Sequence, residues 1–239
     1  LGDVYKRQVL GTQETVKNPR PAAESNLMGG LNMLEAATQY NLPGTYIGVG
    51  NHWMNNTYSI SKTMIERFIN MFNTDRGTQI NIVRALNAYG PRQRPIAPWG
   101  SGKVRKITPS FVCRALAGLD IEVYGNGAQV SDMVYVTDVA KALVVATEKA
   151  AEGDVFKEAV EVGPAKSTTV QQFAQMVIDA AGSNSKIVNL PMRPGEIPNS
   201  VVSADWETLK LVDMNVSELV PLEKGLLDTV AYFKNEYFS

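Results

Sequence analysis

The chain has 239 residues, of which 44% are hydrophobic and 20% are charged, enough for a buried core and one large or two small domains. Lys and Arg total 23 against 24 for Asp and Glu, so bulk charge indicates no nucleic-acid partner. The longest apolar runs, such as 142–146, fall far short of the roughly 20 residues of a membrane helix. One cysteine, Cys113, excludes an internal disulfide, and a reducing cytoplasm is the expected compartment.

The first half of the chain alternates between helical and strand patterns. Apolar residues recur at helical spacing from 21 to 40, and Asn41 with Pro43 marks the end of that helix. A strand at 45–50, a helix at 55–68 and a strand at 78–90 follow. This order, with strands that are apolar almost throughout, predicts a parallel sheet covered by helices on both faces.

The second half continues the same pattern more loosely. We expect helices at 108–118, 138–149, 170–181, 204–212 and 221–238, and strands at 121–125, 132–136, 159–163 and 186–191. No internal repeat or low-complexity segment interrupts them. The fold class is therefore α/β.

Tyr58 and Lys62 lie four residues apart on the helix predicted at 55–68, so their side chains share one face. A nearby ammonium favours phenolate, but pulling the pKa of a tyrosine from 10 towards 7 takes about 4 kcal/mol. A second cation in a water-poor pocket, such as an oxidised nicotinamide ring, would help. The spacing alone is more typical of an ordinary amphipathic helix than of a catalytic pair. Its place after a strand of a parallel sheet favours a ligand site, because ligands gather beyond the carboxyl ends of such strands.

Five segments then stand in a characteristic order along the chain: ESNLMGGLNMLEAA at 24–37, YSISKTMIERF at 58–68, IVRALNAYGPRQ at 82–93, VYGNGAQVSDMVYVTDVAKAL at 123–143 and MRPGEI at 192–197. Together they resemble the extended short-chain dehydrogenase/reductase family, specifically its NAD-dependent nucleotide-sugar epimerases and dehydratases. The resemblance runs from about Pro21 to Phe238.

The resemblance implies roles for four residues. Tyr58 is the expected catalytic acid/base, and Lys62 is expected to bind the nicotinamide ribose and to lower the pKa of Tyr58. Asn26 matches an asparagine on the cofactor side; the less favoured alternative is a polar helix residue or cap. Asn87 matches an asparagine that contacts substrate and cofactor, and NAD is the expected cofactor.

The resemblance also implies a site for the diphosphate of a nucleotide sugar. Arg193, before Pro-Gly, is the main candidate, since a guanidinium presents a bidentate fork to phosphate. Arg105 is a further substrate-binding candidate, with Lys103 and Lys106 beside it, although such a basic cluster is often a solvated loop. His52 is the lone histidine and has no clustered partner, so no metal site is expected.

The chain departs from the family at the phosphate-binding loop. No G-x-x-G-x-x-G follows a first strand, and the acidic residue for the adenosine ribose is likewise missing. We therefore expect that roughly 60 to 75 residues are missing at the N-terminus, at about 30 residues per βαβ unit. Residues 1–8 are expected to be an artificial addition. As given, the chain is expected to bind NAD poorly.

A second departure concerns the third catalytic group, a Ser or Thr on the strand before the tyrosine helix. Residues 48–50 are Gly-Val-Gly there, and Asn51, Asn55 or Asn56 could donate instead. The Asp-Glu pair of the dehydratases is also absent, which favours epimerisation or simple oxidoreduction. Ser131 stands where the family has an arginine, which removes one expected phosphate contact.

These patterns predict a Rossmann-like doubly wound parallel sheet with a smaller C-terminal α/β substrate-binding region. Residues 1–88 plus 130–163 are assigned to the NAD-binding domain, and 89–129 plus 164–239 to the substrate-binding domain. The expected function is NAD-dependent epimerisation of a nucleotide sugar, most simply at C4. A sugar reductase or dehydratase of the same fold, or a catalytically silent nucleotide-binding relative, stays open, and a cytoplasmic homodimer is the expected form.

Overall fold

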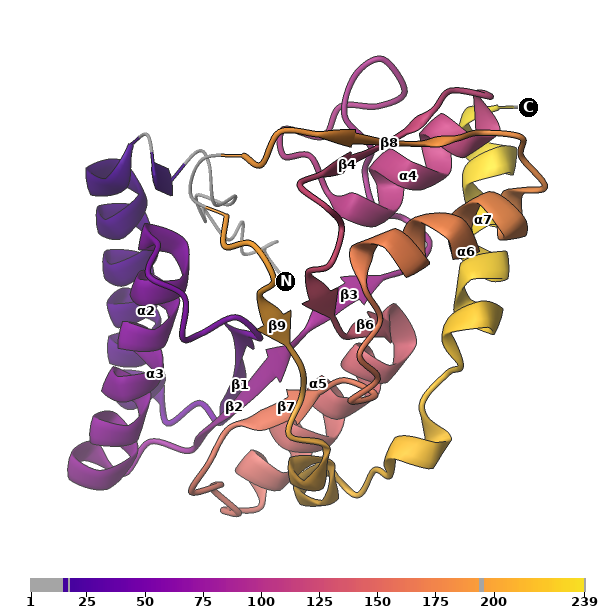
Figure 1. Cartoon of the computed structure of the whole chain (residues 1–239). Helices are drawn as coiled ribbons and strands as arrows, with labels where there is room; N and C mark the ends of the chain where they lie inside the picture. The colour runs from indigo at the N-terminus through magenta and orange to yellow at the C-terminus, as the bar shows by residue number, and fades with distance from the viewer. Residues whose placement is uncertain (1–14, 17, 194–195, 239) are drawn as a thin grey trace. The chain divides into compact units, whose positions relative to one another are not determined.

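The computed structural model describes residues 15–16, 18–193 and 196–238 (Figure 1). It divides into two compact units. Unit 1 comprises Leu1–Ala85, Lys141–Glu161 and Glu207–Met214. Unit 2 comprises Leu86–Ala140, Val162–Trp206 and Asn215–Ser239. These bounds place 130–140 in unit 2 and 207–214 in unit 1, unlike the ranges expected from the sequence. The assignment of one domain to cofactor and the other to substrate stays a prediction.

Unit 1 is built on a sheet with the strand order β1-β2-β7. The strands are β1 (Gly44–Val49), β2 (Ile80–Ala85) and β7 (Val160–Val162). β1 and β2 are parallel, and their register places Gly48 opposite Arg84. The helical elements are α2 (Pro19–Tyr40), α3 (Thr57–Arg76), the larger part of α5 (Val136–Ala151) and the 3-10 helix η1 (Trp206–Val212).

Alternation along β2 separates the two faces of this sheet. Ile80 and Ile82 are buried in a cluster with residues of α2 and α3, whereas the amide of Asn81 donates to Ala146 O of α5 over 2.9 Å. Because successive side chains of a strand point to opposite faces, α3 and α5 cover opposite faces of the unit 1 sheet.

The two N-terminal helices of unit 1 lie side by side (Figure 1). Gly30 permits this approach, since a Cβ there would lie 2.4 Å from Ile65 Cδ1 of α3. α3 begins at Asn56, whose side chain accepts from Ser59 N over 2.9 Å, and ends at Gly77 in the left-handed region with φ 66°.

Unit 2 contains three parallel strand pairs. They are β3 (Asn87–Tyr89) with β6 (Met133–Tyr135), β4 (Ile121–Tyr124) with β8 (Ile187–Leu190), and β5 (Val130–Ser131) with β9 (Val201–Val202). The helices are α4 (Ile107–Leu116), α6 (Val170–Ala181) and α7 (Leu222–Tyr237), with the short 3-10 helix η2 (Val216–Glu218). The core of unit 2 includes Tyr89, Phe111, Phe173 and Phe233.

The structure corrects two elements of the sequence-based reading. The strand expected over 78–90 is divided into β2 and β3 at Leu86, whose N–H donates to Val162 O over 3.3 Å, because the chain changes pairing partner there. The helix expected at 204–212 is the 3-10 helix η1. β5 and β9, with two residues each, were not predicted. In the part of the chain that the structure describes, no helix has the length and apolarity to cross a membrane.

Candidate active site

Tyr58 and Lys62 lie in the first turns of α3, where the Asn56 cap sets the start of the helix. Lys62 is only 2% exposed, and Tyr58 is half-buried. The sequence reading expected a lowered pKa for Tyr58. In the structure burial raises the pKa of its hydroxyl, because desolvation penalises the phenolate. A lowered pKa therefore requires a cation positioned close to the phenol oxygen.

The ammonium of Lys62 lies over the ring of Tyr46 on β1. Its Nζ is 4.1 Å from the ring centroid, and the Tyr46 hydroxyl donates to Lys62 O over 3.5 Å. Burial raises the pKa of Tyr46, and the charges of Glu66 and Tyr58 add to this effect. The phenol of Tyr46 thus stays neutral and presents its ring face to the buried cation.

Asn26 joins α2 to the same helix. Its Nδ2 donates to Ser61 Oγ over 3.0 Å, and Ser61 Oγ donates in turn to Tyr58 O over 3.0 Å. Asn26 is buried, so its amide lies beside the turn that carries the tyrosine. Its expected contact with a cofactor stays a prediction.

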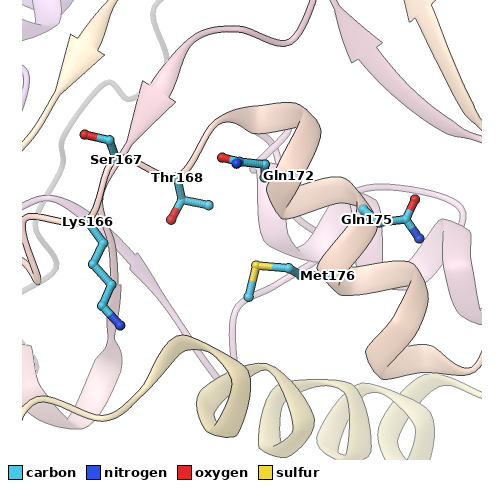
Figure 2. Close-up of a pocket in the computed structure, with 6 residues that line it drawn as sticks. All are labelled: Lys166, Ser167, Thr168, Gln172, Gln175 and Met176. Atoms are coloured by element: carbon cyan, nitrogen blue, oxygen red, sulfur yellow. The ribbon is translucent and has the colours of Figure 1, made fainter.

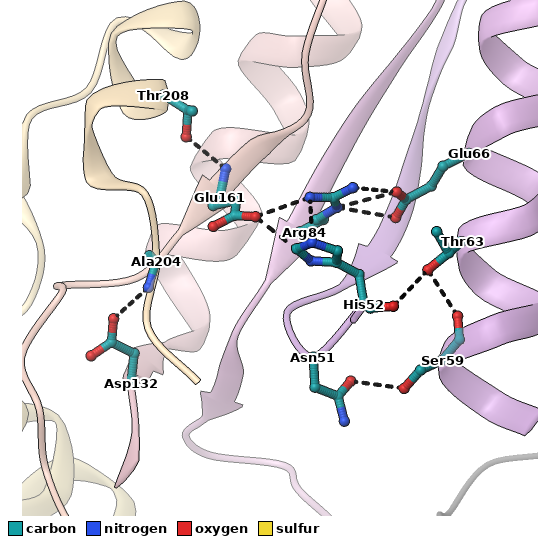
Figure 3. Close-up of polar contacts among 10 residues, drawn as sticks. All are labelled: Asn51, His52, Ser59, Thr63, Glu66, Arg84, Asp132, Glu161, Ala204 and Thr208. Carbon is teal, nitrogen blue, oxygen red and sulfur yellow. Dashed lines mark hydrogen bonds and ion pairs between the residues drawn. The ribbon is translucent and has the colours of Figure 1, made fainter. Parts of the chain in front are cut away.

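A charged network that sequence reasoning missed lies beside α3 (Figure 3). Arg84 Nη2 is 2.7 Å from Glu66 Oε2, and its Nη1 is 3.0 Å from Glu161 Oε1. Nη1 also lies 3.5 Å from His52 Nε2, and because a guanidinium only donates, that nitrogen accepts in this contact. An arginine in the strand run 80–86, whose other residues are apolar except Asn81, was the available signal.

The turn between β1 and α3, residues 50–54, is attached to α3 at two points (Figure 3). Ser59 Oγ donates to Asn51 Oδ1 over 3.4 Å, and Thr63 Oγ1 donates to His52 O over 3.2 Å. Asn56, one of the residues considered as a replacement for the catalytic hydroxyl, uses its side chain as the helix cap. Asn51 and Asn56 thus both bond to Ser59, the residue next to Tyr58, Asn51 through the Ser59 hydroxyl and Asn56 through the Ser59 N–H.

The resemblance implies a hydroxyl residue in the region of Gly48, and the structure gives a steric reason for a glycine there. A Cβ at this position would lie 2.4 Å from Glu66 Oε1 and 3.0 Å from Arg84 Cγ. The glycine therefore makes room on β1 for the Glu66–Arg84 ion pair.

In unit 2, Asn87 donates its amide to the hydroxyl of Ser131. The neighbouring Asp132 is fully buried, and its Oδ2 accepts from Ala204 N over 2.8 Å (Figure 3). Burial raises the pKa of Asp132, partly offset by hydrogen bonds that include this one. The structure thus brings together Asn87 and Ser131, the residue for which the resemblance implies an arginine.

Two sequence-predicted arginines of unit 2, Arg105 and Arg193, lie against one aromatic ring. Their guanidinium carbons are 5.4 and 4.5 Å from the ring centroid of Tyr124. Arg105 donates to Glu122 over 2.7 Å and to the Tyr124 hydroxyl over 2.9 Å, and Arg193 is paired with Glu196. Both guanidinium groups have carboxylate partners that a phosphate would have to displace.

A surface depression of about 440 Å³ lies beside α6 (Figure 2). It is lined by Lys166, Ser167, Thr168, Gln172, Gln175 and Met176. None of the site residues expected from the sequence lines it. The first N–H groups of α6 donate to Gln129 O, Gly127 O and the Thr169 hydroxyl, so the helix start beside it offers no free anion site. Across the described residues no cluster of three metal-ligating side chains occurs.

Parallel strand pairs, helices on both faces of the unit 1 sheet and the Tyr58–Lys62 helix define an α/β protein of the short-chain dehydrogenase/reductase type. The profile described as "NAD dependent epimerase/dehydratase family" matches residues 7–163. The chain belongs to this family, which confirms the expected enzyme class, the Rossmann-like fold and, for the family, the cofactor NAD.

Three similar proteins illustrate the range of reactions. A UDP-N-acetyl-alpha-D-glucosaminuronate decarboxylase of Bacillus cytotoxicus is 26% identical over 95% of this chain and 74% of its own length. The UDP-glucose 4-epimerase of Thermotoga maritima, solved with UDP-glucose, is 26% identical with a TM-score of 0.82, covering 95% of this chain and 75% of that one. The UDP-glucose 4-epimerase of Thermus thermophilus, solved with NAD, is 27% identical with a TM-score of 0.79, covering 96% and 76%. Nucleotide-sugar chemistry is common to the three.

Proposed function

We propose that this protein is a nucleotide-sugar 4-epimerase that uses NAD, with Tyr58 as the acid/base. The observation that carries the proposal is the placement of Tyr58 and the buried Lys62 in the first turns of α3, the helix that follows β1. The likeness to two UDP-glucose 4-epimerases supports the choice of reaction. The absence of the Asp-Glu pair from the sequence supports it against dehydration.

The residues of unit 1 fit the nicotinamide–ribose end of the cofactor. A buried ammonium beside a half-buried phenol is a donor set suited to ribose hydroxyls, and Lys62, Tyr58 and Asn26 would supply it. The printed sequence contains no G-x-x-G-x-x-G, so we assign no residue of it to the pyrophosphate. Held by these residues, NAD would supply the reversible hydride transfer that the epimerisation needs.

Tyr58 handles the proton of this reaction. Its phenolate oxygen takes the proton of the sugar hydroxyl as the C–H bond breaks, and the phenol gives the proton back when the carbonyl is reduced. Because burial raises the pKa of Tyr58, the positive charge of Lys62 has to stabilise the phenolate.

Asn87, Arg105 and Arg193 are the proposed substrate ligands. Arg193 and Arg105 would exchange the carboxylates of Glu196 and Glu122 for the diphosphate, a charge-assisted contact of the same geometry. We extend the proposal to a cytoplasmic enzyme that forms a homodimer.

The test is incubation of the protein with NAD and UDP-glucose, deuterated at C4 of the sugar, followed by ¹H NMR. The expected product is the C4 epimer with its deuterium retained and with no net change in NAD, because the same hydride leaves and returns. Tyr58→Phe is expected to lower the rate by about 10²-fold or more at an unchanged melting temperature.

Parallel incubations with UDP-N-acetylglucosaminuronate and with NADH separate the alternatives. Release of CO₂ would assign the chain to the decarboxylases, and steady consumption of NADH with a keto-sugar would assign it to the reductases. Because the chain is expected to bind NAD poorly, each incubation is repeated at increasing NAD concentrations. If no sugar changes at an NAD concentration that saturates the protein, the enzymatic proposal is wrong.

A further inference from the structure

Lys62 can carry out its proposed role only if its ammonium is held in one place, and the structure places the ring of Tyr46 against it. Lysine has four rotatable side-chain bonds, and its charge is a compact point with no fixed fork of donors. On α3, Glu66 lies four residues beyond Lys62, the spacing at which helical ion pairs form. A Lys62–Glu66 pair would draw the ammonium along the helix.

Arg84 occupies that carboxylate instead. Its Nε is 3.3 Å from Glu66 Oε1 and 3.1 Å from Oε2, and its Nη2 is 2.7 Å from Oε2. Glu66 is 3% exposed, Arg84 is half-buried, and the guanidinium contacts both carboxylate oxygens. The negative charge nearest to Lys62 on its own helix is thereby already compensated.

The face of Tyr46 then meets the ammonium. Lys62 Nζ lies 4.1 Å from the ring centroid, Tyr46 is 6% exposed, and the ring is fixed within the hydrophobic cluster of unit 1. A cation–π contact is strongest when both groups are out of water. β1 is rigid, since it pairs with β2 along its whole length, so Tyr46 presents a stationary surface to a flexible side chain.

We propose that Tyr46 is a positioning residue for Lys62. Its ring face holds the ammonium where Lys62 can stabilise the phenolate of Tyr58, while the ion pair with Arg84 keeps Glu66 from binding the ammonium. This inference rests on the proposed function only where it concerns the effect of Tyr46 on turnover. The placement itself is a property of the folded chain and can be measured without substrate.

The test compares Tyr46→Phe, which keeps the ring, with Tyr46→Leu, which removes it. The first readout is NMR of the lysine side chains, with Lys62 assigned by its loss in Lys62→Arg. Protons above an aromatic ring are shifted upfield, so the Hε protons of Lys62 are expected upfield of the other lysines in the parent and in Tyr46→Phe. In Tyr46→Leu they are expected to return to the common position.

The second readout is the dependence of kcat/KM on pH with a nucleotide sugar and NAD. A displaced ammonium leaves the phenolate of Tyr58 less stable, so in Tyr46→Leu the rising limb is expected to move to higher pH. A shift of about one unit lowers the rate about tenfold below that limb. Tyr46→Phe is expected to keep the parent profile.

Phe72→Leu is the matched control for loss of an aromatic ring. Phe72 is 3% exposed, lies in the same cluster and has its own cation contact, Arg76 Cζ at 4.1 Å from the ring centroid. This variant should lose stability without moving the Lys62 resonances or the pH profile.

Lys62 Hε resonances at the common lysine position in the parent would overturn the proposal. It would also be overturned if Tyr46→Phe or Phe72→Leu changed the Lys62 resonances and the pH profile as much as Tyr46→Leu does. If Tyr46→Leu does not fold, the parent spectrum and the Tyr46→Phe comparison still decide the placement. Shifted resonances in a chain that turns over no sugar would support the placement and refute only the proposed function.

Discussion

At the scale of single residues, Arg84 determines much of what surrounds it in unit 1. Burial by itself would lower the pKa of this guanidinium, but hydrogen bonds and charges from Glu66 and Glu161 outweigh that effect and raise it. Removing one partner of such a buried pair typically costs about 3–5 kcal/mol, because the other charge is left uncompensated. The residues that touch Arg84 are therefore under tight steric and electrostatic demands.

Gly48 is the first such residue, and its replacement is a direct test. Gly48→Ala places a Cβ 2.4 Å from Glu66 Oε1, so the ion pair must shift. We expect the free energy of unfolding to fall by about 1–3 kcal/mol, as overpacking in a filled interior does. Urea unfolding followed by circular dichroism measures this loss.

Gly44→Ala on the same strand is the control, because a Cβ there meets nothing within 4 Å. Its effect should stay within about 0.5 kcal/mol. Equal stability of the two variants would show that the Glu66–Arg84 pair does not need the space at Gly48.

At the scale of elements, α6 shows how local chemistry sets a helix boundary. Thr169 Oγ1 accepts from Gln172 N over 3.1 Å, and Gln172 Oε1 accepts from Thr169 N over 2.9 Å. This reciprocal capping box lies within four consecutive residues. The helix begins at Val170 and ends before Gly182 at φ 59°, as the sequence pattern predicted.

Thr169→Ala is expected to lower the free energy of unfolding by about 1 kcal/mol, because it removes the acceptor for Gln172 N. Chemical denaturation of the full chain measures the change. Thr168→Ala, one residue earlier and outside the capping box, should have a smaller effect. A larger loss at Thr168 than at Thr169 would contradict this account of the helix start.

The contrast between α6 and the strands explains which elements the sequence could predict. Helix starts and ends depend on neighbours three or four residues away, so α2, α4, α6 and α7 were expected close to their observed bounds. The helix expected at 55–68 is longer than predicted, because α3 continues to Arg76. β5 and β9 each have two residues and exist only through their mutual pairing, Val130 with Val201 and Ser131 with Val202. A segment of two residues has no local pattern from which such a pairing could be predicted.

At the scale of the whole molecule, the core of unit 2 isolates the one thiol of the chain. Cys113 is fully buried in α4, within the cluster that contains Phe111 and Phe173. Burial raises the pKa of the Cys113 thiol to about 12, because the apolar surroundings disfavour the thiolate. Its reactivity therefore reports opening of unit 2.

We predict that a disulfide reagent at pH 8 modifies Cys113 at least about 100-fold more slowly in the native protein than in urea, since reaction requires the buried thiol to open to solvent. The folded pKa lies above the unfolded value, so the contribution of this group to stability is complete below the unfolded pKa of about 8.5. It declines as the pH rises from there towards 12. Labelling rates with and without urea, from pH 7 to 10, measure both effects.

Cys113→Ser should abolish the signal and thereby confirm its source. Rapid labelling of the native protein at pH 8 would show that α4 is open to solvent, contrary to the structure.

The sequence by itself determined the α/β class, most helix bounds, the family and the Tyr58–Lys62 pair, because periodicity, caps and motif order are written in neighbouring residues. Only the tertiary structure decided that Arg84 joins Glu66 to Glu161, that Tyr46 faces Lys62, and that Asn87 meets Ser131. These partners lie 16 to 77 residues apart along the chain. Which distant side chains meet depends on how strands pair and helices pack, and a linear pattern of residue types does not contain that geometry.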